Sequence, residues 1–309
     1  MARVADLRPT KGIRIGMQKE AETGTALTDA MGEFHITSYN LPSESVPVET
    51  GSDLVGKTTQ QNLINRKDNA TWTLDMTVMG TTSFYSFLSG LGFGTITDTT
   101  IYGGSESCTI LIEGGGHSVG SPNALFRGCV VQSITIKQDA GTESGQTLID
   151  VSFMTGYRGG SISGSLHDFT YPETTFADNL FSETVKIGET DLSPLSWDLT
   201  ISRTMERVGY DASFNPNGYA QASVFEITGT INAKTDSNVA LLSDYLKGDT
   251  SESVSFTGTG NIITMAKTKA DNATYDTGGS YITTAIPFRA WGSGTVLEII
   301  GPTSATEEG

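Results

Sequence analysis

Apolar side chains return at every second position in many separate runs of this sequence. In the clearest run, Trp72, Leu74, Met76 and Val78 alternate with threonine or aspartate. A period of two marks a strand with one buried face, and Thr or Ser on the other face favours antiparallel sheets with one solvated side. The same period occurs in residues 108–112, 130–136, 149–153, 197–201, 225–231, 254–256 and 282–288. The sequence therefore predicts an all-β chain that folds as a barrel or a sandwich.

The composition agrees with a β-rich, turn-rich protein. Of the 309 residues, 36 are glycine, while 37% are hydrophobic and only 17% are charged. The net charge of −16 argues against binding nucleic acid by neutralising phosphates, which requires clustered Lys and Arg. The first residues lack the apolar core of a secretory signal, so we expect synthesis and folding in the cytosol. Cys108 and Cys129 are accordingly predicted to be buried free thiols.

Two short helices are predicted beside the strands. Residues 82–91 carry Phe and Leu on one helical face, and Gly92 follows as a stop signal. Residues 236–248 begin at Asp236, a good N-cap, and end at Gly248. The predicted fold is therefore all-β with short flanking helices.

The order of these elements occurs twice along the chain. A strand at 72–79, a helix and a strand at 108–113 are matched by a strand at 225–232, a helix and a strand at 253–257. Further strands follow each copy, at 128–157 and at 281–291. We predict an N-terminal arm over residues 1–35, a first domain over 36–165 with a long loop at 42–70, and a second domain over 166–309 that includes a C-terminal extension.

One short motif suggests catalysis. Residues 116–120 match G-x-S-x-G, which would make Ser118 a nucleophile. That motif requires a helix directly after it, whereas a strand is predicted there, so a glycine-rich loop is the preferred interpretation and a hydrolase stays an alternative. The three histidines and two cysteines are too scattered for a zinc site. No catalytic residue, metal or cofactor is predicted.

Several segments, taken in order, resemble a known family. In the second half they are residues 195–205, residues 218–233 and a final strand at 286–288, and in the first half they are residues 128–136 and 147–153. Together they resemble the tail tube proteins of long-tailed bacteriophages. The resemblance implies two tandem tube domains, each a β-barrel or sandwich, and no enzymatic activity.

The resemblance also implies assembly into a virion tail. Sheets of neighbouring subunits would join edge to edge into rings, and the rings would stack into a hollow tube through which the genome passes. With two domains in each chain, a trimeric ring of pseudo-sixfold symmetry is favoured, and a hexamer stays open. The implied partners are further copies of the chain and the tape measure, distal tail and tail terminator proteins. DNA would pass without specific binding, and no membrane contact is implied.

Polar residues of the alternating strands are the candidates for the wall of the channel. They are Ser133, Thr135, Asp139, Glu143, Asp150 and Ser152 in the first half and Asp198, Thr200, Glu226 and Thr228 in the second. A negative wall would repel phosphates, which requires the 35 acidic residues to be concentrated on this face. The basic residues predicted to pair across subunit or ring contacts are Lys57, Arg66, Lys67, Arg203 and Arg207.

A protein of a different class stays open as an alternative, namely an acidic β-sandwich that acts as a binding or adhesin module. Such a module exposes clustered aromatic side chains. Trp72, Trp197 and Trp291 are all in phase with apolar strand positions, so they are predicted to belong to the core.

Overall fold

Strands form most of the chain. The computed structural model describes residues 14–26, 31–40, 43–45, 48–50, 63–65, 71–97, 106–113, 123–139, 147–157, 160–162, 169–170, 184–213, 215–258 and 261–300. Only short helices occur among these residues. The predicted all-β fold with short flanking helices is confirmed.

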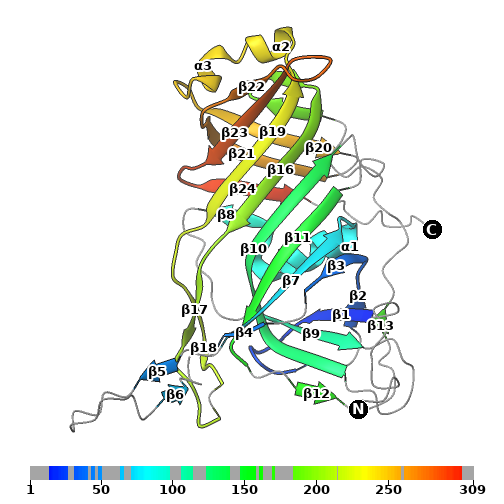
Figure 1. Cartoon of the computed structure of the whole chain (residues 1–309), viewed down its shortest axis with the longest axis vertical. Helices are drawn as coiled ribbons and strands as arrows, with labels where there is room; N and C mark the ends of the chain where they lie inside the picture. Colours follow the sequence, from blue (N-terminus) through cyan, green and yellow to red (C-terminus); the bar gives the residue numbers. More distant parts are fainter. Residues whose placement is uncertain are drawn as a thin grey trace.

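One antiparallel sheet, called the long sheet below, runs through the whole length of the molecule (Figure 1). Its hydrogen-bonded order is β3 (Ile36–Tyr39), β7 (Thr71–Met79), β11 (Thr147–Thr155), β10 (Asn123–Asp139), β16 (Pro194–Ser202), β19 (Glu226–Lys234) and β23 (Thr283–Ala290). Strands from both halves of the sequence therefore belong to a single sheet.

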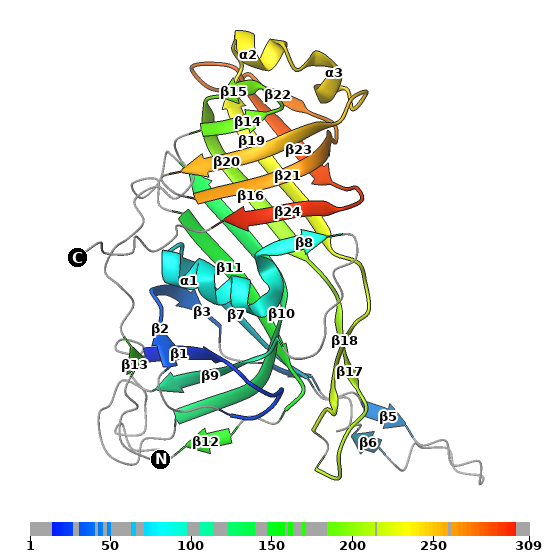
Figure 2. The same cartoon turned by 180° about the vertical axis from the view of Figure 1, so that it is seen from behind.

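A second layer of strands lies behind the long sheet (Figure 2). Behind its upper part are β14 (Thr184–Ile187), β15 (Thr190–Leu192), β20 (Glu252–Gly258), β21 (Asn261–Ala270), β24 (Thr295–Ile300) and β8 (Thr95–Thr97). Behind its lower part are β1 (Arg14–Lys19), β2 (Met31–Glu33), β9 (Cys108–Glu113) and β12 (Gly160–Ile162), which pair with the first half of β10 or with one another. The result is a sandwich in which β10 passes from the rear layer into the long sheet.

The core fills the space between the two layers. Trp72, Leu74, Met76 and Val78 of β7 are buried as the alternation predicts. Trp197 is also buried and stacks on Phe256 of the rear layer, with 4.2 Å between ring centroids. The inward residues of the long sheet thus meet aromatic and branched side chains of the rear strands.

The prediction for Trp291 is wrong, because 51% of this residue is exposed. It lies just after the end of β23, and Gly292 and Gly294 with positive φ turn the chain away there. Its ring is covered by Lys267, whose Nζ lies 5.6 Å from the ring centroid. The inward residues of β23 are Thr284, Ile286 and Phe288, so Trp291 is out of phase with the buried side of the strand as well as beyond its end.

The first predicted helix is present and changes form near its end. Helix α1 (Thr82–Leu88) begins at Thr81, whose hydroxyl accepts a hydrogen bond from the Phe84 N–H, and continues as a π-helical turn over Ser89–Phe93. Gly92 adopts φ +87°, a conformation that side chains disfavour. Helix α1 covers the inner side of β7 and β11 (Figure 2).

The second predicted helix is divided in two. Asp236 caps α2 (Ser237–Ala240) as predicted, but α3 (Ser243–Leu246) is a separate turn. Leu242 bonds back three residues, to the Val239 carbonyl. This tighter turn places Val239, Leu242 and Tyr245, which are three residues apart, together in the core.

The pairing of strands repeats along the chain. In the first half β1 pairs with β2 and β9, β3 with β7, β7 with β11, β9 with β10 and β10 with β11. In the second half β14 pairs with β15 and β20, β16 with β19, β19 with β23, β20 with β21 and β21 with β23. The internal repeat is therefore one of topology, while the domain boundary at residues 165 and 166 and the arm over 1–35 stay predictions.

A buried carboxylate holds the lower part of the fold together. Glu20, 2% exposed, follows β1. One of its oxygens accepts hydrogen bonds from the Gly24 N–H and the Ser107 hydroxyl, each 2.7 Å long, and the other accepts from the Thr109 hydroxyl at 2.7 Å and the Gly128 N–H at 2.8 Å. Four donors from three separate segments satisfy one charge, so the carboxylate fixes how these segments meet.

Glu20→Gln is predicted to destabilise the chain. The amide nitrogen cannot accept, so two donors lose their partner in a buried site, at a cost of about 1–3 kcal/mol. Urea denaturation followed by tryptophan fluorescence measures the change. The exposed Glu22 supplies the matched control Glu22→Gln, and equal stability of the two variants would contradict this role of Glu20.

Gly229→Ala is predicted to destabilise the long sheet. A Cβ at Gly229 would lie 2.4 Å from the Asp198 carbonyl oxygen and 2.5 Å from the Phe288 ring, so β16 and β23 would both have to move. Overpacking of this kind costs about 1–3 kcal/mol. The matched control is Gly218→Ala, where a Cβ meets nothing within 4 Å. A thermal unfolding scan should show a lower Tm for the first variant only, and an unchanged Tm there would contradict the prediction.

Candidate functional site

The outward residues of the long sheet form one continuous polar surface, called the polar face below. These residues alternate with core residues along every strand. Because the side chains of directly opposed residues point to the same side of a sheet, the register brings them together on one face. The polar residues of this face are Ser38, Thr71, Thr73, Asp75, Thr77, Ser133, Thr135, Lys137, Asp139, Asp150, Ser152, Ser196, Asp198, Thr200, Ser202, Glu226, Thr228, Thr230, Asn232, Lys234, Thr283 and Arg289.

Nine of the ten candidates for the channel wall lie on the polar face. They are Ser133, Thr135, Asp139, Asp150, Ser152, Asp198, Thr200, Glu226 and Thr228, while Glu143 falls outside the described residues. The register places Thr135 opposite both Asp150 and Thr200, and Thr200 opposite Thr228. The sequence therefore selected residues of one surface from both halves of the chain. That this surface lines a channel stays a prediction.

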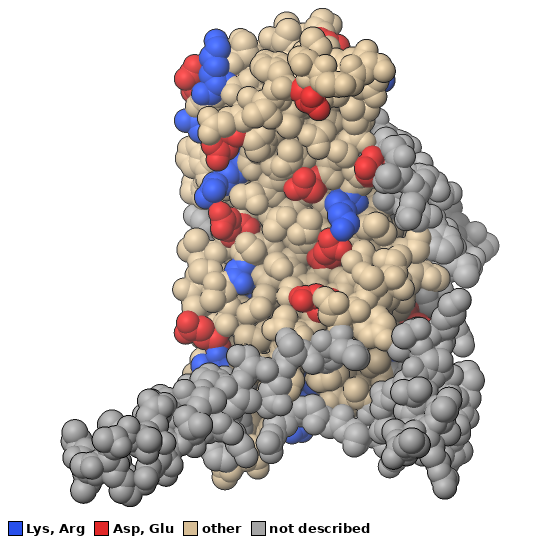
Figure 3. All heavy atoms as spheres, viewed as in Figure 1, with Lys and Arg blue, Asp and Glu red and all other residues tan. Residues whose placement is uncertain are grey.

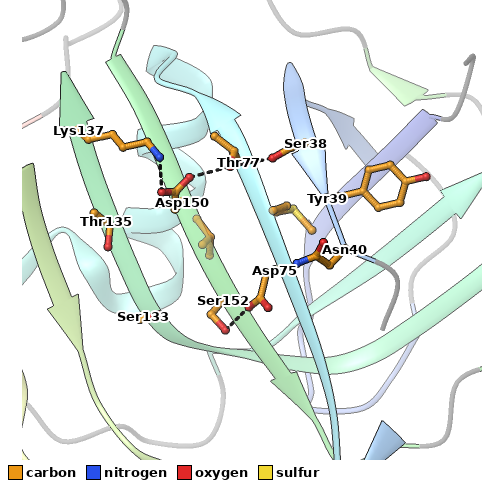
Figure 4. A pocket seen from close by; sticks show the side chains of 12 residues that line it. Ser38, Tyr39, Asn40, Asp75, Thr77, Ser133, Thr135, Lys137, Asp150 and Ser152 are labelled. Atoms are coloured by element: carbon orange, nitrogen blue, oxygen red, sulfur yellow. Dashed lines mark hydrogen bonds and ion pairs between the residues drawn. The ribbon is translucent and has the colours of Figure 1, made fainter. Parts of the chain in front are cut away.

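Hydrogen bonds connect the side chains of the polar face (Figure 4). The Thr77 hydroxyl donates to Asp150 over 2.7 Å, and Lys137 forms an ion pair with the other oxygen of the same carboxylate at 2.5 Å. The Ser152 hydroxyl donates to Asp75 over 2.6 Å. The Thr135 and Thr200 hydroxyls lie 2.9 Å apart, so one side-chain hydrogen bond on this face joins the first half of the chain to the second.

A hollow of about 390 Å³ opens on the polar face between β3 and β10. Its lining includes the carboxylates of Asp75 and Asp150 and the ammonium group of Lys137, all of which are hydrogen-bonded to neighbours. No histidine or cysteine is part of the lining. The described residues also contain no group of three His, Cys, Asp or Glu side chains arranged to hold a metal ion.

Acidic and basic residues are mixed on the polar face (Figure 3). The described residues contribute five acids, Asp75, Asp139, Asp150, Asp198 and Glu226, and three bases, Lys137, Lys234 and Arg289. Arg289 forms an ion pair with Glu226 at 3.0 Å. The whole chain has 35 acids to 19 bases, so this face has no greater share of acids than the chain as a whole. The expected concentration of acids is not found among the described residues.

Burial changes the titration of Asp198 on the polar face. Desolvation raises the pKa of its carboxyl group, and hydrogen bonds from Thr230 partly oppose that rise. The charged form of Asp198 is thus less favourable in the folded chain than in the unfolded chain.

The basic residues predicted to pair between subunits lie in different surroundings. Arg203 is only 6% exposed, because its Nε donates to the Val131 carbonyl at 3.1 Å and its guanidinium lies over the rings of Phe93 and Phe225. This side chain is used inside the chain and offers little surface to a neighbour. Arg207 is half-buried on β17 (Met205–Val208), which pairs with β18 (Gly218–Gln221). Lys57, Arg66, Lys67 and the candidate nucleophile Ser118 fall outside the described residues.

The candidate set omitted several residues of the polar face. Asp75 and Thr77 alternate with the core of β7, and Lys137 alternates with the core of β10. The period of two in these predicted strands would have identified these residues as well. The alternation pattern does not predict the order of the strands in the sheet, and it therefore did not show that β7 lies next to β11.

A comparison with known protein families identifies the family of this chain. The sequence matches the family described as phage tail tube protein over residues 10–290. The chain belongs to the phage tail tube protein family. The resemblance seen in the sequence is confirmed, and the match covers both topological repeats.

Membership of the tail tube family gives the chain a structural role in the tail of a phage particle. No curated protein sequence matches the chain. In the described residues, no helix combines the length and the apolar character that a membrane-spanning helix needs.

Asp198→Asn is predicted to raise the Tm at pH 7. Because folding raises the pKa of this carboxyl group, its ionised form costs stability at neutral pH, and stability is regained as the pH falls through the folded-state pKa. The gain of the variant should therefore shrink at acid pH, where the wild-type group is neutral as well. Thermal scans between pH 4 and pH 8 measure this.

The matched control is Asp150→Asn on the same face. This variant loses the ion pair with Lys137, so its Tm at pH 7 should fall slightly or stay unchanged. A lower Tm for Asp198→Asn at pH 7 would contradict the assigned cost of its charge.

Proposed function

We propose that this chain is the main subunit of a phage tail tube. Copies of it join into rings, the rings stack into a hollow tube, and the polar face of the long sheet lines the channel that carries the genome into the host. The subunit is made in the host cytoplasm and has no enzymatic activity. The observation that carries the proposal is the coincidence of a tail tube family match with one polar face built from both halves of the chain.

The chemistry of the polar face supports a channel wall. DNA that passes along a wall must not be held there, and phosphate binding comes chiefly from Lys and Arg. On the polar face Lys137 and Arg289 are each paired with a carboxylate, and the remaining members are mostly hydroxyl and amide groups. Such a wall is wetted and offers few cationic partners to phosphates.

The internal repeat supports one proposed number of chains in a ring over another. Each chain contains two copies of one topology, so three chains would supply six equivalent units. A ring of three is therefore preferred, with a ring of six as the alternative. The tape measure, distal tail and tail terminator proteins are the proposed partners at the inside and the two ends of the tube.

A binding or adhesin module is less well supported. Trp72 and Trp197 are buried, and the exposed Trp291 already packs against Lys267. This arrangement offers no paired tryptophans for a sugar or a receptor among the described residues. The family match also gives no support to that class.

Electron microscopy tests the proposed function. Concentrated purified protein and the tails of the corresponding particles should both show stacked rings about 40 Å apart, an estimate from roughly 12 strand residues at ~3.3 Å each. A helical reconstruction should place the polar face toward the channel. A chain that stays monomeric at every concentration and is absent from particles would contradict the proposal.

A further inference from the structure

The two cysteines of the chain lie directly opposite each other. Cys108 is the first residue of β9, and Cys129 lies in β10, the antiparallel neighbour of β9. The register pairs these two residues with one another. The sequence contains no other cysteine, and residues 109–128 separate the two. The fold therefore brings together the only two thiols of the chain.

Both cysteine side chains point into the core. Directly opposed residues share one face of a sheet, and both cysteines are 0% exposed members of the same core cluster. The Cα atoms of opposed residues in an antiparallel pair lie about 4.5–5.5 Å apart, and a disulfide joins Cα atoms about 4.4–6.8 Å apart. Both thiols are free in this structure. The pair thus has the placement of a cross-strand disulfide without the bond.

A bulge in β10 lies directly before Cys129. Arg127 and Gly128 together stand opposite the single residue Thr109, and Gly128 adopts φ +58°. A bulge of this kind bends its strand. Strand β10 pairs with β9 up to Cys129 and with β11 from Val130 onward. A covalent bond at Cys129 would therefore fasten the strand that connects the two layers, at the point where it passes from one to the other.

Burial keeps the two thiols unreactive while the fold is closed. Desolvation raises the pKa of both thiols well above the usual range, and the neighbouring Cys108 raises the pKa of Cys129 further. Because the thiolate is the nucleophile, little of the reactive form is present at neutral pH. Cys108 nevertheless lies at the end of its strand, where local opening costs less than in the middle of a sheet. Oxidation is therefore slow and requires a small oxidant.

We propose that Cys108 and Cys129 form a disulfide within the folded chain when it meets hydrogen peroxide. One thiolate attacks the peroxide, so its sulfur becomes a sulfenic acid and the other oxygen leaves as water. The sulfur of the second cysteine then displaces the sulfenic hydroxyl group, which leaves as a second water. The two thiols lose two electrons and two protons in total, and these reduce the peroxide to two molecules of water.

The cross-link fits the environments that a tail subunit meets. The cytosol keeps thiols reduced, whereas the medium outside a cell is oxidising. Under the proposed function the chain is made in the first environment and works in the second, so the bond forms after release of the particle. This timing rests on the proposed function. The bond itself does not, because both thiols belong to one chain.

Oxidation of the purified full-length chain tests the disulfide. The fully reduced protein is treated with hydrogen peroxide at neutral pH, unfolded, and alkylated at its remaining thiols. A peptide map made without reductant should join the peptides that contain Cys108 and Cys129, and a reductant should restore both thiols. The oxidised chain should have a Tm a few degrees higher than the reduced chain, because the bond closes a loop of about 20 residues.

Exchanging two neighbouring residues provides the matched control. The variant Cys129→Val with Val130→Cys has the same composition, but its second thiol lies on the other side of β10, since Val130 belongs to a different core cluster from Cys129. Once a thermal scan shows that this variant is folded, the same treatment should leave its thiols unjoined.

The outcomes separate this inference from the proposed function. The inference is overturned by a folded wild-type chain that keeps both thiols, that is oxidised to sulfinic acid without the bond, or that is joined only to other chains. An equal yield of the bond in the folded control variant overturns it as well. Rings in micrographs from a chain that does not form the bond leave the proposed function standing. The bond in a chain that never forms rings supports this inference while the proposed function fails.

Discussion

The backbone pairing of β10 with β16 is the contact on which the rest of the structure depends. In the order of the long sheet, β10 is the strand of the first repeat that lies next to the second repeat, and it pairs with β16 over seven register pairs. Without it the two copies would be two sandwiches connected by a loop. With it their outward residues form one surface, and their inward residues share one core that extends from Leu74 of β7 to Phe288 of β23. Buried apolar area supplies most of the stability, and the hydrogen-bonded register decides which residues share a face.

The sequence predicts the faces of strands better than their neighbours. Alternation is a local signal, so it identified nine residues that lie on the polar face, although they are distributed over four strands of two repeats. The partners of a strand depend on distant segments, so nothing local showed that β7 lies beside β11 or that Glu20 reaches the backbone of Gly128. The same limit explains Arg203, whose charge suggested a surface contact and whose aromatic neighbours come from two distant segments.

Errors at the ends of elements have a similar cause. Trp291 was expected in phase with the apolar positions of β23, but the inward residues of that strand are Thr284, Ile286 and Phe288, and its pairing ends at Ala290 before the chain turns. The second helix has a good N-cap and a good C-terminal glycine, yet it divides because a tighter turn from Val239 to Leu242 lets both of these residues and Tyr245 reach the core. In each case packing, which involves residues far away in the sequence, decides the geometry that the local pattern leaves open.

The structure changes how the net charge of the chain is interpreted. A net charge of −16 first suggested a wall that repels DNA, but the polar face has acids and bases in nearly the proportion of the whole chain. In the proposed channel the wall is passive for a more local reason. Lys137 is paired with Asp150 and Arg289 with Glu226, so two of the three bases on the face already have anionic partners, and the third, Lys234, lies over the Tyr281 ring. The hydroxyls of Thr77 and Ser152 donate to aspartates, and those of Thr135 and Thr200 lie within hydrogen-bond distance of each other. Satisfied polar groups remain wetted without offering strong new partners, so DNA would slide past such a wall even where salt screens the net charge.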